Sequence, residues 1–546
     1  METYSVRRAA LLAAFVLSGL GCNTVPTETG PDLGRHTFAV QTKVAAAQRH
    51  FDRGLAWCYA FHHDEARRSF SAAVTADPDF AMGYWGLAYA AGPHINNMEM
   101  TEDATKFAYE NATRAAALAS TRPSLERALI HAIGQRYRWP APQDRKELDA
   151  AYADAMAAAH HLHGDHPDVA ALYAESLMDL QPWDLWNEDG SPKGRTPEIL
   201  FVLERLLAAH PRHPQGCHLY IHAVEASPQP ERAIPSAERL GTLVPAAGHL
   251  VHMPSHAFLR VGRYADAAEA NRLGIAADLA IIDRTGREGF YEIYRAHNFH
   301  FLVYACMFLG RAEEAITNAR AIPRELPADV VKAMPQFLDG FMAVPTHALV
   351  RFGRWEEMLR EPEPESWLPV TRAFWHYGRG VALAALDRKD EAVAERAAFE
   401  AAFAAVPADY MIGNNPARTV LEIGRALLTG EVAVRAGEHD AAFAALRDAV
   451  ARDDALRYDE PWGWMMPARH ALGALLLEAG RVEEAEAVYR KDLARHNGNG
   501  WAWHGLEECL RRRGATAEAD AAAASFGKAW GHADVQIKSS CFCRRS

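Results

Sequence analysis

The sequence predicts an all-α protein, an α-solenoid of about nine or ten helix pairs that winds into a right-handed superhelix. Three observations support this fold class. From about residue 38 the chain is rich in alanine and shows no sustained alternation of apolar and polar residues, so long half-buried strands are not expected. A unit of constant pattern recurs along the chain, and a glycine recurs at the turn inside the unit.

Composition narrows the choice of partners. The chain has 546 residues, a formal net charge of −12 and a pI of about 6.1. It has no extended basic stripe, which argues against nucleic acid as a partner. The unusual feature is the presence of 26 histidines.

Residues 1–22 have the features of an export signal. Arg7 and Arg8 precede an apolar run over 9–17, and small residues follow it up to Cys22. The run is shorter than the apolar stretch that a membrane-spanning helix usually requires. A cysteine directly after small residues resembles the bacterial lipoprotein box, so Cys22 is a candidate lipid anchor, and an ordinary cleaved signal is the alternative. We expect an exported protein of the periplasm or cell envelope, which meets a membrane only through Cys22.

A tether and the first repeat unit follow the signal. Residues 23–37 are rich in Pro, Gly and Thr and are predicted to be the tether. Between residues 51 and 90, small residues stand where two helices would touch, aromatic residues stand in the gaps, and a proline ends the second helix. The unit resembles the tetratricopeptide repeat. The residues that carry the pattern are Ala66, Phe70, Ala73, Pro78, Tyr84, Leu87 and Ala88.

Further units extend the superhelix over residues 38–530. Glycine stands at the predicted turn between the two helices of a unit at Gly262, Gly310, Gly353, Gly437 and Gly480. The stretches 100–165 and 372–410 are helical but poorly phased. Long loops are expected over 182–197, 361–369 and 407–416, either as simple insertions or as lids.

The cysteines fall into two groups. Four stand singly inside helical patterns and are expected in the core, as small apolar residues: Cys58, Cys217, Cys306 and Cys509. Cys541 and Cys543 lie in the polar C-terminal tail over 531–546. Because export permits disulfides, these two could pair. Metal binding and a disordered tail without a role are the alternatives.

Three clusters with histidines fall at equivalent places in consecutive repeats, over about 214–322. Ala233 and the turn glycines Gly262 and Gly310 set the register without reference to histidine. In that register the clusters occupy first-helix positions that line the concave groove of such repeats. The clusters are His218, His222 and Glu225, then His249, His252 and His256, then His297, His300 and Tyr304. Later repeats place His347 and His470 at groove positions too.

Chance is a poor explanation for so many histidines on one surface. Adjacent repeats stack about 10 Å apart, so side chains from neighbouring helices can converge. Converging neutral imidazoles suit a transition metal, with copper the first choice and zinc the second, and they suffice for more than one ion. The predicted ligands are His218, His222, His249, His252, His256, His297 and His300.

Two further groove residues are assigned to catalysis. Glu225 is a candidate ligand, acid/base or partner of a ligand, and Tyr304 is a candidate hydrogen-bond donor to a substrate or ligand. There is no HExxH, P-loop, GxSxG or Rossmann motif. The alternatives for the whole cluster are a protonatable groove that binds an acidic peptide and plain structural packing.

Four segments resemble exported bacterial tetratricopeptide-repeat proteins of largely uncharacterised function. They are HLYIHAVEASPQPERA, PAAGHLVHMPSHAFLRVGRYADA with its GHxxHMPSH motif, RAHNFHFLVYACMFLGR and RYDEPWGW. The resemblance implies the superhelical fold and no particular activity.

The sequence therefore favours an exported metalloenzyme, copper-dependent and oxidative, with a small-molecule or peptide substrate in the concave groove. Two other hypotheses remain open. One is a metal-binding or metal-buffering lipoprotein without turnover. The other is an adaptor that binds proteins of the cell envelope, which is the usual role of such repeats.

Overall fold

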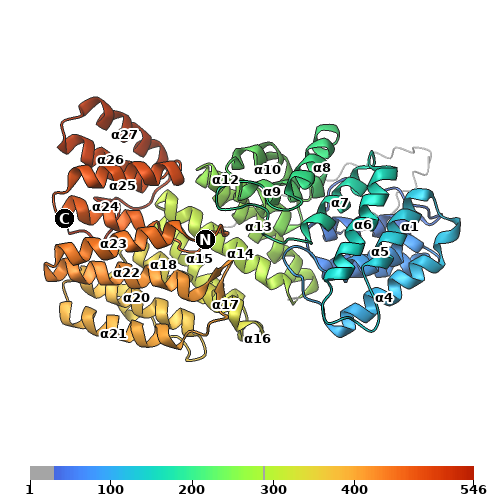
Figure 1. Cartoon of the computed structure of the whole chain (residues 1–546), viewed down its shortest axis with the longest axis horizontal. Coiled ribbons are helices and arrows are strands. Elements are labelled where there is room, and N and C mark those ends of the chain that lie inside the picture. The colour runs from blue at the N-terminus through green and yellow to red at the C-terminus, as the bar shows by residue number, and fades with distance from the viewer. Residues whose placement is uncertain (1–29, 287–288, 546) are drawn as a thin grey trace, which may run out of the picture.

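The predicted all-α solenoid of helix pairs is confirmed. The structure is a computed structural model that describes residues 30–286 and 289–545. Figure 1 shows the chain running from the blue N-terminal pairs, through the green pairs in the middle, to the orange and red C-terminal pairs. No helix in the described ranges has the length and apolarity needed to cross a membrane. The signal segment and Cys22 lie outside the described residues, so export and lipidation remain predictions.

The N-terminal half consists of antiparallel helix pairs in which each helix packs on the next along the chain. Its helices are α1 (Ala45–Tyr59), α2 (His63–Ala76), α3 (Ala81–Ala90), α4 (Glu102–Ala117), η1 (Ala119–Thr121), α5 (Ser124–Gln135), α6 (Lys146–His163), α7 (Pro167–Met178), α8 (Thr196–Ala209), α9 (Pro214–Glu225), η2 (Pro230–Ala233) and α10 (Ile234–Leu240). The poorly phased stretch over 100–165 thus contains α4, η1, α5 and α6, with a loop over 136–145.

The middle and C-terminal pairs continue the same order. Their helices are α11 (Gly248–His252), α12 (Pro254–Arg260), α13 (Tyr264–Thr285), α14 (Tyr291–Leu309), α15 (Ala312–Glu325), α16 (Ala328–Ala333), α17 (Pro335–Met342), α18 (Val344–Arg351), α19 (Trp355–Arg360), α20 (Pro369–Ala385), α21 (Lys389–Ala405), α22 (Ala417–Ala436), α23 (His439–Asp454), α24 (Ala468–Glu478), α25 (Val482–Arg495), α26 (Gly500–Arg512) and α27 (Thr516–Ala529). A two-stranded hairpin, β1 (Met411–Ile412) and β2 (Asn415–Pro416), precedes α22.

The first repeat packs as its sequence pattern predicts. Phe70 is fully buried between α1 and α3, and its ring fills the space beside Gly54 and Gly86. A Cβ atom at Gly86 would lie 2.4 Å from that ring. Ala66 and Ala73 are also fully buried on α2. Small residues therefore let the helices approach while one aromatic ring fills the gap.

The predicted turn glycines adopt the left-handed conformation that glycine tolerates best. The φ angles are +79° at Gly262, +70° at Gly310, +62° at Gly353, +82° at Gly437 and +75° at Gly480. This conformation reverses the chain between the two helices of a pair.

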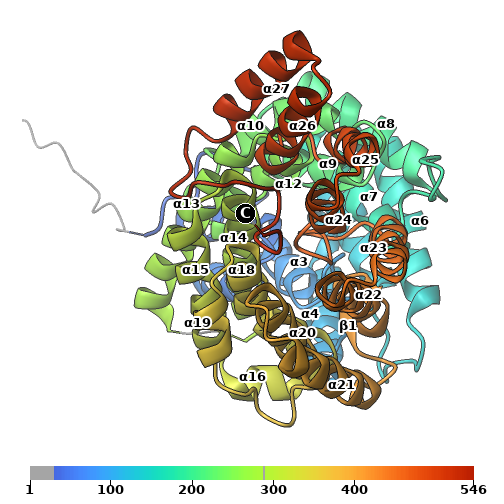
Figure 2. The same ribbon diagram turned by 90° about the vertical axis from the view of Figure 1, so that its left-hand side faces the viewer.

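The superhelix brings distant repeats into contact. In the view along the long axis, the helices wind around the centre of the molecule, with α12 close to α25 and α26 (Figure 2). The turn at Gly262 packs directly on the turn at Asn497, so a Cβ atom on Gly262 would lie 2.2 Å from the Asn497 carbonyl oxygen. The segment 455–467, between α23 and α24, consequently reaches the histidines of the middle repeats.

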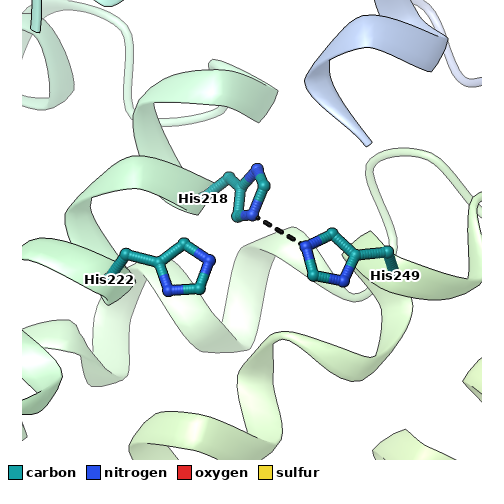
Figure 3. Close-up of side chains that lie close together, drawn as sticks. All are labelled: His218, His222 and His249. Atoms are coloured by element: carbon teal, nitrogen blue, oxygen red, sulfur yellow. Dashed lines mark hydrogen bonds between the residues drawn. The ribbon is translucent and has the colours of Figure 1, made fainter. Parts of the chain in front are cut away.

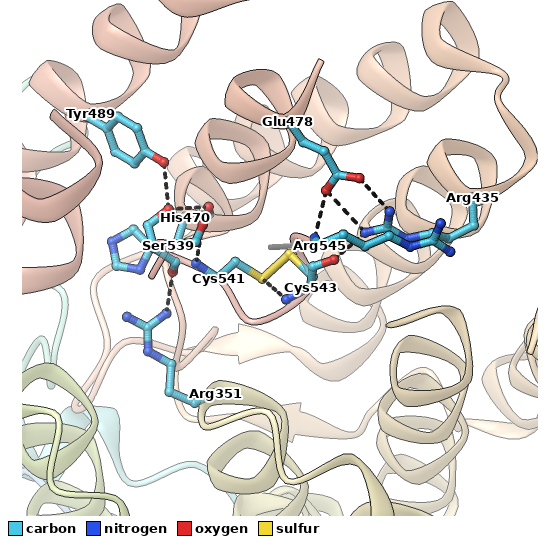
Figure 4. Close-up of a disulfide and its surroundings, with 10 residues drawn as sticks. Arg351, Arg435, His470, Glu478, Tyr489, Ser539, Cys541, Cys543 and Arg545 are labelled. Atoms are coloured by element: carbon cyan, nitrogen blue, oxygen red, sulfur yellow. Dashed lines mark hydrogen bonds and ion pairs between the residues drawn. A yellow bond between two sulfur atoms is a disulfide. The ribbon is translucent and has the colours of Figure 1, made fainter. Parts of the chain in front are cut away.

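The C-terminal tail is part of the folded structure rather than a disordered segment. Cys541 and Cys543 form a disulfide, and Ser540 and Cys543 are buried (Figure 4). The Ser540 hydroxyl lies 2.7 Å from the Tyr489 hydroxyl, and Arg435 donates to the carbonyl of Cys543. The tail is ordered because its buried residues form hydrogen bonds with Tyr489 and Arg435 of the last repeats.

Part of the predicted tether is also packed. In residues 30–37, Leu33 is buried and the His36 imidazole lies 2.7 Å from the Asp168 carboxylate. The carbonyl of Asp32 accepts a hydrogen bond from the backbone of Ala246. Composition suggested a tether, but these specific contacts hold the segment against α7 and the turn before α11. The four single cysteines are buried, as predicted.

Candidate metal centre

Four helices bring the histidines together, namely α9, α11, α12 and α14. On α9, His218, His222 and Glu225 stand at intervals of four and three residues and share one face. The GHLVHMPSH segment forms two short helices, because Pro254 begins α12 after α11 ends at His252. Sequence spacing alone suggested one continuous helix. His249, His252 and His256 nevertheless remain buried and face α9 and α14.

His218, His222 and His249 form a first triad. One ligand atom from each residue lies within 4.8 Å of the others. The Nε2 atoms of His218 and His249 are 3.1 Å apart. Figure 3 shows the three rings turned toward a common point between α9 and α11.

Outer partners fix the ring orientation of two members of this triad. Nδ1 of His218 donates to the carbonyl oxygen of Tyr59 at 2.8 Å, since a carbonyl only accepts. Nδ1 of His222 lies 2.8 Å from Oε1 of Glu225. Both contacts turn Nε2 of the ring toward the triad, and in His218 this Nε2 is unprotonated because Nδ1 carries the proton. Nε2 of His222 is buried and has no hydrogen-bond partner, which is a costly arrangement unless a ligand occupies the site.

His252, His256 and His297 form a second triad with the same limit of 4.8 Å between ligand atoms. The Nε2 atoms of His252 and His256 are 2.9 Å apart. Nδ1 of His252 donates to Oδ1 of Asn271 at 2.9 Å, and the Asn271 amide nitrogen in turn donates to the Ala267 carbonyl. The orientation of this ring is thus also fixed from outside the triad.

Glu225 connects the two triads. Its Oε1 faces His222 of the first triad, and its Oε2 lies 2.7 Å from Nδ1 of His256 in the second. Both carboxylate oxygens are engaged and the side chain is buried. Burial and the neighbouring Glu460 carboxylate raise the pKa of Glu225. A cation held by the histidines would offset both effects.

Glu460 belongs to the same cluster, although the sequence argument missed it. Its Oε2 lies 2.7 Å from Nδ1 of His256, and its Oε1 accepts a hydrogen bond from Tyr458 at 2.8 Å. Glu460 comes from the segment between α23 and α24, more than 200 residues after α9. The only sequence signal was its place in RYDEPWGW, one of the segments in the family resemblance.

The imidazoles are held in the form that binds metals. Burial lowers the pKa of His218 to about 3. Burial first, and the neighbouring imidazoles second, hold the pKa values of His222, His249 and His297 well below the ordinary value. Neutral imidazoles with exposed lone pairs are the usual protein ligands of zinc and copper.

The other predicted site residues lie outside the triads. Nε2 of His300 lies 3.3 Å from the sulfur of Met465. Tyr304 lines a second cavity together with Arg260 and Arg495. Nε2 of His470 lies 2.8 Å from the Asp492 carboxylate, away from both triads.

A separate group of His36, Asp168 and His213 has a structural role. Nδ1 of His213 accepts from the backbone of Gly216, so its Nε2 carries the proton and points to Asp168 at 3.3 Å. Asp168 also accepts from the Tyr59 hydroxyl at 2.6 Å. With its nitrogens so engaged, the His213 ring offers no lone pair to a metal. The group instead anchors Tyr59, whose carbonyl orients His218.

One predicted loop covers the first triad. In residues 182–197, the ring of Trp183 lies 5.2 Å from that of His222, and its indole donates to the Ile95 carbonyl. Trp186 donates to the carbonyl of Ala223 on α9. These hydrogen bonds hold the loop in place over the first triad. Trp183 also lines a cavity that reaches both triads.

No family model matches the chain, and no curated protein matches its sequence. Among solved structures, it is similar to the P58(IPK) TPR domain at 13% identity and a TM-score of 0.21, over 86% of this chain and 98% of that one. It is also similar to the human IFIT1 dimer with m7Gppp-AAAA, at 11% identity and a TM-score of 0.34, over 90% and 91%. Neither similarity is close, and the fold described above rests on the chain's own helix pairs.

Proposed function

We propose that the two triads bind two transition-metal ions and that the protein is a metal-dependent, oxidative enzyme. The observation that carries this proposal is the convergence of six imidazoles, five of them buried and that of His297 half-buried, in two sets of three. Four of them have Nδ1 engaged by an outer partner, which turns Nε2 toward the other imidazoles of the triad: His218, His222, His252 and His256. Such outer hydrogen bonds orient metal-binding histidines and raise their basicity.

The spacing of the nitrogens supports a metal. Two imidazole nitrogens on one tetrahedral ion would lie about 3.3 Å apart, given metal–nitrogen bonds of about 2.0–2.1 Å. The facing Nε2 atoms lie 3.1 Å apart in the first triad and 2.9 Å apart in the second. Small movements of the rings would therefore accommodate an ion in each triad.

Copper is our first choice and zinc the second, because the ligands are imidazoles and no cysteine belongs to either triad. Three protein ligands leave a coordination position open for a substrate. Bound copper would supply redox chemistry with O₂, and bound zinc would supply a Lewis acid and an activated water. The cavity that reaches His222, His249, His256 and His297 favours an enzyme over a closed storage site.

The test is the metal content of the full chain purified without an affinity tag. We expect about two equivalents of copper or zinc by elemental analysis. His218→Ala and His252→Ala should each remove about one equivalent, because they belong to different triads. The exposed His161 on α6 provides the control, and His161→Ala should change nothing.

Less than about half an equivalent of any transition metal, with no uptake of added Cu²⁺ or Zn²⁺, would overturn the proposal. Two equivalents of metal without O₂-dependent or hydrolytic turnover of any substrate would instead favour a metal-binding protein that is not an enzyme.

A further inference from the structure

The cavity beside the triads has a strongly aromatic wall. Its volume is about 260 Å³, and one end is formed by histidines of both triads. The rest is mostly apolar, with aromatic side chains from the loop over 182–197, from the residue before α14, and from α14, α17 and α20. These side chains are Trp183, Phe290, Tyr294, Phe337, Phe341 and Phe374.

The rim of this cavity is unusually apolar for a surface. Phe337 is 48% exposed and Trp183 is 37% exposed, and both line the cavity. Ile412 from the β1–β2 hairpin stands beside them and is half-buried. Exposed apolar side chains gathered around an opening mark a binding site for an apolar partner.

Away from the triads, the side chains that line the cavity disfavour anions. No lysine or arginine of the described ranges lines the cavity, and the two acidic residues that do are Asp459 and Glu460. A carboxylate or phosphate placed against the aromatic wall, away from the triads, would leave water without a cationic side chain beside it, which costs several kcal/mol. A neutral molecule avoids this cost.

The lining also offers a few hydrogen-bonding groups away from the triads. Nδ1 of His300 and Nδ1 of His347 are buried without a hydrogen-bond partner. Both residues line the cavity. A hydroxyl or amine on a bound molecule could satisfy one of these atoms, which would offset the cost of leaving it unpaired.

The volume limits the size of the occupant. An engineered cavity of about 150 Å³ in another protein accommodates benzene. A cavity of about 260 Å³ therefore has room for one or two fused aromatic rings with a small substituent.

We infer that this cavity binds a neutral, largely aromatic small molecule of one or two rings, placed against the metal-binding histidines. As a statement about the substrate class, this inference rests on the proposed function. Binding itself depends on the aromatic wall and the absence of cationic side chains.

The test compares two probes with the same ring system, 2-naphthol and 2-naphthalenesulfonate, by titration calorimetry on the full chain as purified. The sulfonate is anionic and a weak metal ligand. We expect one site per chain for 2-naphthol, with an affinity at least about tenfold tighter than for the sulfonate.

Three variants locate the site. Ile412→Trp should fill the cavity and weaken 2-naphthol binding at least about tenfold, and Phe337→Ala should weaken it about threefold by removing one wall. Both residues are partly exposed, so the fold should tolerate the changes. Phe201 on α8 is 59% exposed and does not line the cavity, so Phe201→Ala is the matched control.

Absence of 2-naphthol binding, equal or tighter binding of the sulfonate, or binding that Ile412→Trp leaves unchanged would each overturn the inference. Metal content is measured on the same samples. Full metal content with no preference for 2-naphthol would overturn this inference alone. Missing metal with selective 2-naphthol binding retained would overturn the proposed function alone.

Discussion

Glu225 is the residue on which the geometry of both triads depends. Its two oxygens face Nδ1 of His222 and Nδ1 of His256. The sequence left its role open between ligand, acid/base and partner of a ligand. Because both oxygens already hold imidazoles, the geometry supports the third role: Glu225 orients one histidine of each triad.

We expect Glu225→Gln to weaken metal binding about 10–100-fold. The amide has one acceptor and one donor group, so it cannot accept from both Nδ1 atoms. One imidazole must then place its proton on Nε2, which blocks the lone pair that a metal requires. Competition titration with a chelator measures the affinity. Glu238→Gln, at an exposed position on α10, is the control, and equal affinities of the two variants would contradict this role.

Glu431 on α22 gives a pH dependence that is independent of the metal centre. Burial raises the pKa of Glu431 to about 8, and the nearby Arg435 partly opposes this. The folded protein therefore keeps a proton that the unfolded chain loses near the ordinary glutamate pKa of about 4.3. Stability contributed by this group falls as the pH rises toward 8, by at most about 1.4 kcal/mol per pH unit, and is level above 8.

Glu431→Gln should remove this dependence. Urea unfolding at pH 5.5 and pH 8 should show a smaller loss of stability in the variant than in the parent chain. Glu438→Gln, at an exposed position shortly after Glu431, serves as the control. Identical pH dependence in the parent chain and Glu431→Gln would show that Glu431 is ionised throughout.

At the scale of elements, the turn glycines have two different roles. Gly262 and Gly437 have φ angles of +79° and +82°, so both need the left-handed conformation. A Cβ atom at Gly437 would meet nothing within 4 Å, whereas one at Gly262 would lie 2.2 Å from the Asn497 carbonyl oxygen. Gly262 therefore joins two repeats as well as making a turn, whereas Gly437 only makes a turn.

Gly437→Ala should cost about 1 kcal/mol of stability, which is the cost of a left-handed alanine. Gly262→Ala should cost about 2 kcal/mol more, since the contact between the two turns must open. Denaturant unfolding of both variants measures the difference. Equal losses would mean that the contact at Asn497 yields without strain.

The site also depends on elements that are not repeats. The segment over 455–467 delivers Glu460, and the loop over 182–197 delivers Trp183. The sequence located the second loop and left it open whether the loop is a lid. Its hydrogen bonds to Ile95 and Ala223 support a fixed cover over the first triad.

At the scale of the whole molecule, the C-terminal tail ties the last repeats to the middle ones. The Asp534 carboxylate accepts hydrogen bonds from the backbone of Ala312 and Glu313 at 2.6 and 3.1 Å, at the start of α15. The Trp530 ring packs on Gly310. The tail therefore links α27 to the pair that carries His297.

Asp534→Ala should cost about 1–2 kcal/mol, as the loss of a helix N-terminal cap does. Removal of residues 531–546 should cost more, because the buried disulfide segment is lost as well. Thermal unfolding measures both changes. The exposed Asp520 provides a control in Asp520→Ala. A truncated chain as stable as the full chain would show that the tail adds nothing to the superhelix.

The sequence by itself determined the helix pairs, the turn glycines and the shared face of the histidines. These features follow from local periodicity, because a helix places residues three and four apart on one side. Of the seven histidines predicted as ligands, the structure brings six into the two triads. Each repeat contacts mainly its neighbours, so equivalent positions in successive repeats face the same side of the superhelix.

Only the tertiary structure decided which groups complete the site. Glu460, the Tyr59 carbonyl and Asn271 orient histidines from segments that no local pattern connects to them. His300 and Tyr304 share a helix with His297 but lie outside the triads. These contacts depend on the curvature of the superhelix. Small rotations between neighbouring repeats add up along the chain, and their sum determines which distant side chains meet.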